Sequence, residues 1–297
     1  MRPVVALAAA LLMLALPASA SLNGRLVSTG SDTLGALSSL WAQALMREHP
    51  GVRVQVRAVG SSAAPTALVQ ATADIGPMSR PMSEAEKNNF VSRYGYVPTA
   101  IPVAVDTLAV IVHRENPLRS VRRRQLDSLF SANRRCGGTA GISRWGDLGL
   151  GAPLGNRRVS RYGRDAASGT YGFFRMQILC GGDFAPRVGR LVGSAAVVRA
   201  VATDHAAIGY VSRGFVTDSV RRLQVVHDDG REMDLSRDLF LYVNRPPGQA
   251  LSPLVRAYLQ QVFSEAGQNV VRAAGYTPLG GAQRAALREA LQLDAAP

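Results

Sequence analysis

The sequence predicts an α/β fold in which sheets are sandwiched by helices. Short β-prone segments alternate with helix-like segments along most of the chain, and the connections between them are short. With 47% hydrophobic and 19% charged residues, the composition is that of a globular protein. Of the 297 residues, about 280 remain once a predicted N-terminal signal peptide is removed. This length is enough for one large domain or two ordinary ones.

The first 20 residues have the features of a secretory signal peptide. Arg2 precedes an apolar run at 4–16, and the small residues at 18–20 form a cleavage site. The run is too short to span a bilayer comfortably as a retained helix. Ser21 follows the predicted cleavage site where a lipid-modified protein would have cysteine. We therefore expect a soluble mature protein that begins near Ser21 and is periplasmic or secreted.

Seven short apolar segments are predicted to be strands, namely those around Val27 and at 52–56, 97–105, 108–112, 158–162, 207–211 and 239–243. Between the first two, five apolar residues recur at the spacing of an amphipathic helix: Leu37, Leu40, Trp41, Ala44 and Leu45. Ser83 and Glu86 form a capping box, which predicts the start of another helix. The chain shows no internal repeat and no low-complexity linker.

Four loops rich in glycine, serine and threonine each follow a predicted strand and open a helix, at 29–34, 59–62, 76–80 and 164–170. One such loop is ordinary helix capping. Four together indicate a shared site, because open α/β sheets bind ligands at these loop ends. The unpaired N–H groups and positive dipole of a helix N-terminus favour an anion. Arg164 adds an ionised, bidentate donor for two anion oxygens.

The motifs in these loops resemble those of the phosphate-binding proteins of phosphate ABC transporters. They are Gly-Ser-Asp-Thr-Leu at 30–34, Gly-Ser-Ser at 60–62, Gly-Pro-Met-Ser-Arg at 76–80, Arg-x-x-x-Ser-Gly-Thr-Tyr-Gly-x-Phe at 164–174 and Gly-Tyr-Thr-Pro-Leu at 275–279. The resemblance implies a type II periplasmic-binding-protein fold, with two α/β lobes joined by two crossing strands and a ligand cleft between them. It places residues 21–105 and 236–297 in lobe 1 and residues 106–235 in lobe 2.

The resemblance also implies that residues of both lobes hold inorganic phosphate. Those carried over by position are Thr33, Leu34, Ser61, Arg164, Ser168, Gly169 and Thr170. Ser79 stands where many members have an aspartate that accepts the phosphate proton, and Ala166 stands where another aspartate is usual. The ligand is therefore left open between phosphate and other oxyanions such as sulfate, molybdate or arsenate.

Asp32 is the candidate that replaces the missing proton acceptor, and a helix N-cap is its alternative role. We expect Arg80 to pair with a carboxylate at the cleft edge and not to touch the ligand.

Cys136 and Cys180 are expected to form a disulfide in an oxidising compartment, with two buried thiols as the alternative. The formal net charge is +13, almost all from arginine. The arginine clusters at 122–124, 134–135 and 221–222 lack interleaved aromatics and any nucleic-acid-binding motif, so no nucleic-acid partner is expected. A positive field would instead speed the arrival of a small anion.

Two other classes of function remain as alternatives. A hydrolase with Ser31, Ser61 or Ser168 as nucleophile is disfavoured, because the four histidines lie in no recognisable signature and the nucleophile-elbow motif is absent. A phosphate sensor or adhesion protein with the same fold stays open. We expect no catalytic residue, metal or cofactor, and a monomer that docks transiently on the permease subunits of an ABC transporter.

Overall fold

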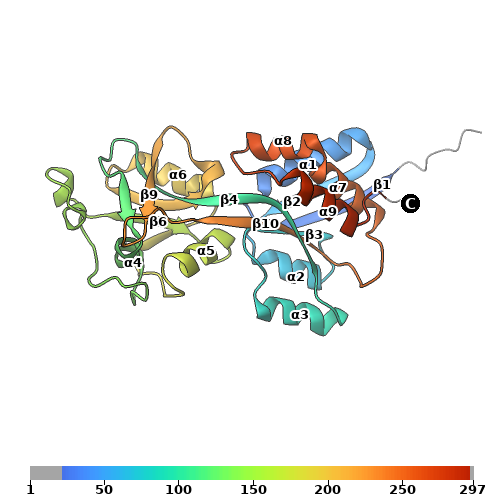
Figure 1. Cartoon of the computed structure of the whole chain (residues 1–297), viewed down its shortest axis with the longest axis horizontal. Helices are drawn as coiled ribbons and strands as arrows, with labels where there is room; N and C mark the ends of the chain where they lie inside the picture. Colours follow the sequence, from blue (N-terminus) through green and yellow to red (C-terminus); the bar gives the residue numbers. More distant parts are fainter. Residues whose placement is uncertain (1–21, 295–297) are drawn as a thin grey trace, which may run out of the picture.

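The computed structural model describes residues 22–294, so the predicted signal peptide lies outside the described residues. Two α/β bodies lie side by side in Figure 1, and two strands run through both: β4 (Thr99–His113) and β10 (Ser236–Val243). These strands pair with each other in antiparallel register, with a shift at Leu239 and Phe240. The predicted α/β class and the pair of crossing strands are both confirmed.

The body that we call the terminal body comprises residues 22–104 and 239–294. Its strands lie in the order β2-β1-β3-β10-β4. β1 (Asn23–Gly30) is parallel to β2 (Gly51–Ala58) and to β3 (Ile75–Met78). One core cluster joins this sheet to α1 (Gly35–Glu48), α7 (Pro253–Phe263), α8 (Glu265–Ala273) and α9 (Gly281–Ala290). A smaller cluster joins it to α2 (Ala63–Val69) and α3 (Glu84–Tyr94).

The central body comprises residues 108–235. The second half of β4 pairs with β8 (Ala207–Ser212) and β9 (Val220–Val226). β6 (Ser160–Arg164) is parallel to β8 and to β7 (Val188–Leu191), and β5 (Ser120–Arg122) pairs with β9. One core cluster includes α4 (Arg123–Phe130) and α5 (Gly169–Gln177), and another includes α6 (Ser194–Thr203). The short 3-10 segments are η1 (Trp145–Leu148), η2 (Leu154–Asn156) and η3 (Arg213–Phe215).

An aromatic cluster fixes the start of α5 against the central sheet. Phe174 of α5 stacks on Tyr210 of β8 with ring centroids 3.9 Å apart, and Phe130 of α4 packs edge-on against both rings. The Tyr210 hydroxyl also accepts a hydrogen bond from the Arg164 amide at 3.3 Å. Because these rings are buried, the loop between Arg164 and α5 starts and ends on rigid elements.

The elements differ from the prediction in three ways. The two predicted strands at 97–105 and 108–112 are one continuous strand, β4. Three of the strands that were not predicted, β3, β5 and β7, have four residues or fewer, too short to show periodicity. Leu40 is 43% exposed, so it does not belong to the buried face of α1. The capping box of Ser83 and Glu86 at the start of α3 is confirmed.

The predicted disulfide between Cys136 and Cys180 is present and links the segment after α4 to the end of α5. It closes a sequence separation of 44 residues within the central body. Within residues 22–294, every helix is too short or too polar to cross a membrane.

Candidate functional site

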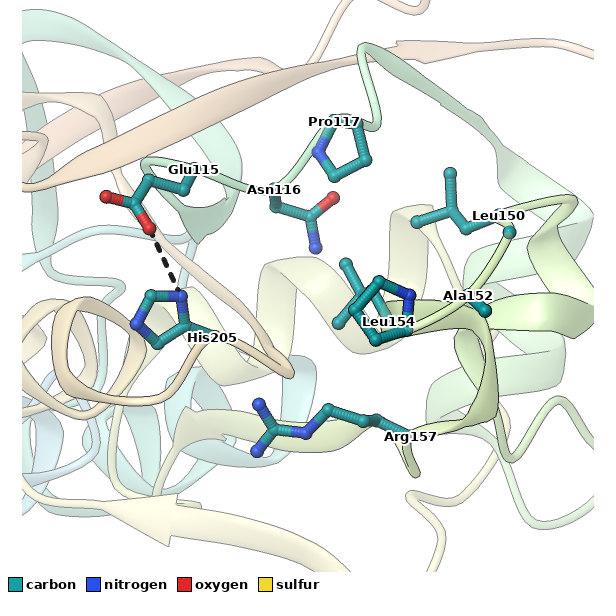
Figure 2. Close-up of a pocket in the computed structure, with 10 residues that line it drawn as sticks. Glu115, Asn116, Pro117, Leu150, Ala152, Leu154, Arg157 and His205 are labelled. Carbon is teal, nitrogen blue, oxygen red and sulfur yellow. Dashed lines mark ion pairs between the residues drawn. The ribbon is translucent and has the colours of Figure 1, made fainter.

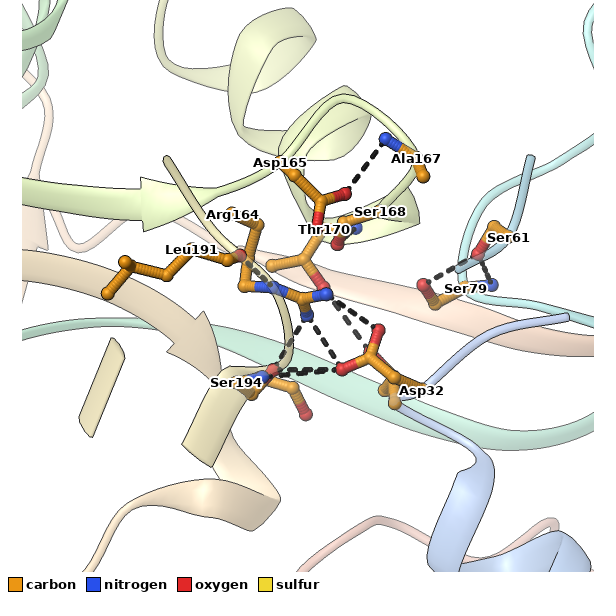
Figure 3. A network of polar contacts seen from close by, with 12 residues as sticks. Asp32, Ser61, Ser79, Arg164, Asp165, Ala167, Ser168, Thr170, Leu191 and Ser194 are labelled. Atoms are coloured by element: carbon orange, nitrogen blue, oxygen red, sulfur yellow. Dashed lines mark hydrogen bonds and ion pairs between the residues drawn. The ribbon is translucent and has the colours of Figure 1, made fainter. Parts of the chain in front are cut away.

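The four predicted loops converge where the two bodies meet (Figure 3). The Thr33 and Thr170 hydroxyls, one from each body, lie 3.3 Å apart. The amide of Ser62 donates to the carbonyl of Ala167 across the same interface at 3.1 Å. The side chains of Thr33, Ser61, Ser79, Ser168 and Thr170 are all buried. The structure therefore brings the predicted site residues together in a closed, desolvated arrangement.

A bidentate ion pair between Arg164 and Asp32 joins the bodies. Nη1 of Arg164 lies 2.7 Å from Oδ2 of Asp32, and Nη2 lies 3.0 Å from Oδ1. Nη1 also donates to the Ser194 hydroxyl at 2.9 Å, and the amide and hydroxyl of Ser194 both donate to Asp32 at 3.4 Å. Since Ser194 begins α6, the carboxylate also lies at the positive end of that helix.

This pairing decides between the two roles considered for Asp32. The N-cap residue of α1 is Leu34, and no side chain caps that helix. Asp32 contacts α1 only through its carbonyl, which accepts from the amide of Gly35. The capping role is therefore wrong, and the carboxylate is directed across the interface. Leu34 is fully buried in the core of the terminal body, so only its backbone is available to a ligand.

Close backbone contact at the interface depends on two glycines. Gly60 has a φ of +111°, and a Cβ at this position would lie 2.8 Å from the Ala167 carbonyl oxygen. A Cβ on Gly169 would lie 2.4 Å from the Ser79 hydroxyl and 2.5 Å from the Ser61 hydroxyl. No side chain fits at Gly169 while the two bodies are this close. The first residue of α5 therefore faces both serines directly.

Ser61 and Ser79 form a pair on the terminal body. Their hydroxyls lie 3.2 Å apart, and the Ser79 amide donates to the Ser61 hydroxyl at 3.1 Å. On the central body, Ser168 caps α5 by accepting from the amide of Thr170 at 3.1 Å. Asp165 accepts from the amide of Ala167, so its carboxylate stabilises the loop. The third loop thus reaches the site through Ser79.

Sequence reasoning missed a buried ion pair beside these residues. Nη2 of Arg237 on β10 lies 2.8 Å from Oδ2 of Asp106 on β4 and also donates to the Thr170 hydroxyl at 2.8 Å. The Ser212 hydroxyl donates to the other oxygen of Asp106 at 2.7 Å. Both charged side chains are almost fully buried. Asp106 inside the otherwise apolar strand β4 was the signal that could have revealed the pair, whereas Arg237 precedes the apolar run of β10.

Tyr276 connects this pair to the first loop. Its hydroxyl donates to the carbonyl of Thr33 at 2.9 Å and lies 3.4 Å from the Ser212 hydroxyl. Burial and the nearby Asp106 raise the pKa of Tyr276, so the phenol stays protonated and can donate. The segment around Tyr276 therefore contributes to positioning the loop that contains Thr33.

The polar atoms at the site that are buried without a hydrogen-bond partner among the described residues include the Ser31 hydroxyl and Nη1 of Arg237. Buried polar atoms without partners are rare, which makes both available to a small ligand. An adjoining groove of about 660 Å³ is lined in part by Ser168, Arg237 and the aromatic residues Tyr171 and Phe173. It connects the site with the surface.

Arg80 lies at the edge of this groove and pairs with Glu86. Its two terminal nitrogens lie 2.7 and 2.6 Å from the carboxylate oxygens, so the expected pairing is confirmed. Burial opposes ionisation of Glu86, but the hydrogen bonds from Arg80 and from the Ser83 amide outweigh it and lower the pKa of Glu86. Arg80 is thus held by a carboxylate at the site's edge.

The arrangement suits a small oxyanion. Each arginine at the centre is paired with an aspartate, so the two ion pairs nearly cancel and the main attraction comes from oriented donors. These are hydroxyls, the N–H groups at the starts of α1 and α5, and the guanidinium N–H groups that the ion pairs do not use. In a buried site, donors that need no reorganisation stabilise an anion more strongly than they would in water.

Comparisons with known proteins agree with this assignment. The profile of the PBP superfamily domain matches residues 17–266. The phosphate-binding protein PstS of Pseudomonas aeruginosa is 42% identical over 274 residues, which cover 88% of this chain and 85% of that protein.

Solved structures have the same fold. A putative phosphate ABC transporter substrate-binding protein from Clostridium perfringens, solved with bound phosphate, superposes with a TM-score of 0.73 at 22% identity and covers 86% of this chain and all of its own. An ABC-type phosphate transport receptor from Vibrio cholerae gives a TM-score of 0.65 at 22% identity, with the same coverage. The expected type II arrangement of two lobes and two crossing strands is confirmed.

The buried Asp106–Arg237 pair generates a stability prediction. Replacing Asp106 with asparagine leaves the Arg237 guanidinium buried without a counter-charge, so we expect the free energy of unfolding to fall by about 3 kcal/mol. Urea denaturation followed by circular dichroism measures the change. Asp228→Asn is the control, because Asp228 pairs with Arg124 at the exposed surface and should change stability very little. Equal effects of the two variants would contradict the prediction.

Proposed function

The chain belongs to the phosphate-binding proteins of the PBP superfamily, and from this membership we propose that it captures inorganic phosphate between its two bodies. The observation that carries the proposal is the convergence of donors from both bodies at one buried point. Thr33 and Ser61 come from the terminal body, and Arg164, Ser168 and Thr170 come from the central body. A tetrahedral ion with four oxygens can accept from both sets at once and so hold the bodies together.

The complete proposed binding set is Asp32, Thr33, Leu34, Ser61, Ser79, Arg164, Ser168, Gly169 and Thr170. Leu34 and Gly169 would contribute backbone amides, since each begins or caps a helix. To this set the geometry adds Arg237, whose Nη1 is buried without a partner and whose Nη2 orients Thr170.

We propose that the bodies act as lobes, with residues 21–105 and 236–297 in lobe 1 and residues 106–235 in lobe 2. The core clusters support this division, because every residue of the large cluster of the terminal body lies within 22–104 or 239–293. The chain crosses between lobes on β4 and β10, close to Asp106 and Arg237. Opening would then occur by a hinge at these strands, and phosphate would favour the closed state.

We also propose that the protein is exported, with residues 1–20 as a signal peptide, and acts in the periplasm as a monomer. It would deliver phosphate transiently to the permease subunits of an ABC transporter. The names of the similar proteins from C. perfringens and V. cholerae support this role, since both are described as parts of ABC-type phosphate transport.

Asp32 is the proposed acceptor of the phosphate proton. Phosphate near neutral pH carries a proton that sulfate lacks, so an ionised carboxylate in the site accepts phosphate and repels sulfate. Oδ2 of Asp32 receives donors from Arg164 and Ser194, whereas Oδ1 is contacted at 3.0 Å by Nη2 of Arg164 alone. Each carboxylate oxygen has two lone pairs, which leaves capacity on Oδ1 for a ligand hydroxyl.

The hydrolase alternative is less well supported by the contacts of the serines. Ser61 exchanges hydrogen bonds with Ser79, and Ser168 accepts from a helix amide. A serine nucleophile needs a base within hydrogen-bonding reach, usually a histidine. His113 and His205 instead lie against each other at the far end of β4.

The proposal is tested by calorimetric titration of the mature protein after bound ligand has been stripped by unfolding and refolding. We expect one phosphate to bind per molecule, and excess sulfate should not displace it, because only phosphate offers a proton to Asp32. Preference for sulfate or molybdate would overturn the assignment of the ligand. No binding of any oxyanion would overturn the solute-binding function itself, and a sensor or adhesion role would then have to be considered.

Closure of the two lobes around the ligand can be tested at Gly169. In Gly169→Ala the new methyl group would collide with the Ser61 and Ser79 hydroxyls of the other lobe, so phosphate affinity should fall at least about tenfold. Thermal unfolding without ligand should change little, since alanine is favourable in α5. Gly172→Ala in the same helix is the matched control, because its Cβ would meet only the flexible Arg80 side chain at 3.3 Å. Unchanged affinity in Gly169→Ala would show that phosphate does not bind between the lobes.

Discrimination between oxyanions is tested with Asp32→Asn. Loss of the carboxylate removes the acceptor for the phosphate proton and leaves Arg164 without its counter-charge. Phosphate should therefore bind more weakly and sulfate more strongly, which shifts their affinity ratio by at least about tenfold. Competitive calorimetry measures the ratio. Asp165→Asn serves as control, because the Asp165 carboxylate contacts the Ala167 amide. An unchanged ratio in Asp32→Asn would exclude Asp32 as the acceptor.

A further inference from the structure

A second cluster of chemically competent side chains lies at the end of β4, away from the interlobe site. It contains His113, the last residue of β4, Glu115 in the turn that follows, and His205 in the turn between α6 and β8. One ligand atom of each residue lies within 4.8 Å of the other two. Figure 2 shows Glu115 and His205 facing each other at one end of a pocket. These three side chains have no part in the proposed phosphate site.

The two imidazole rings are stacked, with centroids 3.8 Å apart and planes tilted by 30°. Nδ1 of His205 lies 3.4 Å from Oε2 of Glu115. Two protonated imidazoles at this distance would repel each other, so at most one is charged comfortably. A single cation bound by both rings and the carboxylate would remove that conflict once the rings turn out of the stack, since a metal ion lies in the plane of each imidazole that binds it.

His113 is held in place by its surroundings. The residue is 6% exposed. Nδ1 accepts a hydrogen bond from the amide of Glu115 at 3.2 Å. A metal at Nδ1 would replace this amide as the partner of the lone pair, and that exchange reduces the affinity expected for the site.

A third feature lies in the pocket that Glu115 and His205 line. Asn116 is 2% exposed and lines the pocket, and its side-chain nitrogen is buried without a hydrogen-bond partner among the described residues. Figure 2 shows this nitrogen directed into the pocket. Its oxygen accepts from the amide of Leu118 and so fixes the orientation of the side chain. A water molecule on a metal ion would supply the acceptor that the nitrogen lacks.

From these observations we propose that His113, Glu115 and His205 bind one divalent transition-metal ion of the Zn²⁺ class, with a solvent molecule in the open position beside Asn116. Two imidazoles and one carboxylate form a ligand set that Zn²⁺ commonly uses when a fourth position is left for water. Imidazole nitrogen also favours such ions over Mg²⁺ and Ca²⁺, which prefer oxygen ligands. The pocket, about 500 Å³ in volume, gives the ion access from solvent.

The ion would act as a cross-link within the central body. His113 ends β4 and Glu115 follows it, while His205 precedes β8, the neighbour of β4 in the sheet. Binding to the folded state should therefore raise thermal stability by mass action. Since all three ligands belong to the central body, the ion does not bridge the lobes. The affinity of the interlobe site for phosphate should be the same with and without it.

The test uses the untagged mature protein, treated with a chelator and titrated with Zn²⁺ in phosphate-free buffer at pH 7.5. We expect one ion per molecule with micromolar affinity and a rise in the melting temperature. His205→Asn and Glu115→Gln should each weaken Zn²⁺ binding at least about tenfold, because each removes one of three ligands. His227→Asn is the matched control, since it removes a histidine that lies outside the cluster.

The outcomes are distinct. Loss of binding in His205→Asn and Glu115→Gln, with His227→Asn like the unmodified protein, supports the site. No Zn²⁺ binding, or equal binding in all four proteins, overturns it. Preference for Mg²⁺ or Ca²⁺ over Zn²⁺ also overturns it. Circular dichroism of each variant shows that it is folded, and because this control does not depend on phosphate binding, failure of either proposal leaves the other untouched.

Discussion

The antiparallel pairing of β4 with β10 is the constraint on which the rest of the structure depends. β4 pairs with β10 in the sheet of the terminal body and with β8 and β9 in the sheet of the central body, so the two bodies share a continuous set of backbone hydrogen bonds. The Asp106–Arg237 pair is buried at this junction and also orients Thr170. Because a buried charge without its partner is costly, this pair favours one register of the two strands and thereby one placement of the loops around them.

The candidate site shows how a buried anion can be held without a large net charge. Arg164 and Arg237 are each matched by an aspartate, and the remaining donors are hydroxyls and helix amides. Such a site attracts an anion by oriented dipoles, which favours ligands that match its donors and acceptors over anions in general. The overall charge of +13 acts at longer range, where it can raise the rate of encounter.

Close packing between the two bodies limits which departures from the family pattern the site can accommodate. Ser79 occupies a position against Gly169 and Ser61 where the space is already filled, so a larger acceptor there would need the lobes to separate. Asp32 binds the guanidinium of Arg164 and accepts from the Ser194 amide at the start of α6. A carboxylate thus lies beside Arg164 although position 79 is a serine.

The sequence by itself determined the α/β class, the four glycine- and serine-rich loops, the disulfide partners and the family. These features are local, since they depend on periodicity, on helix-capping residues and on motif spacing within short segments. Three assignments needed the tertiary structure. Asp32 fits a helix cap equally well in the sequence, and only the fold shows it paired with Arg164 from the other body. The contacts of Asp106 with Arg237 and of His113 with His205 likewise depend on strand register. Strand pairing brings these residues together although they lie far apart along the chain, and the sequence does not indicate that they are in contact.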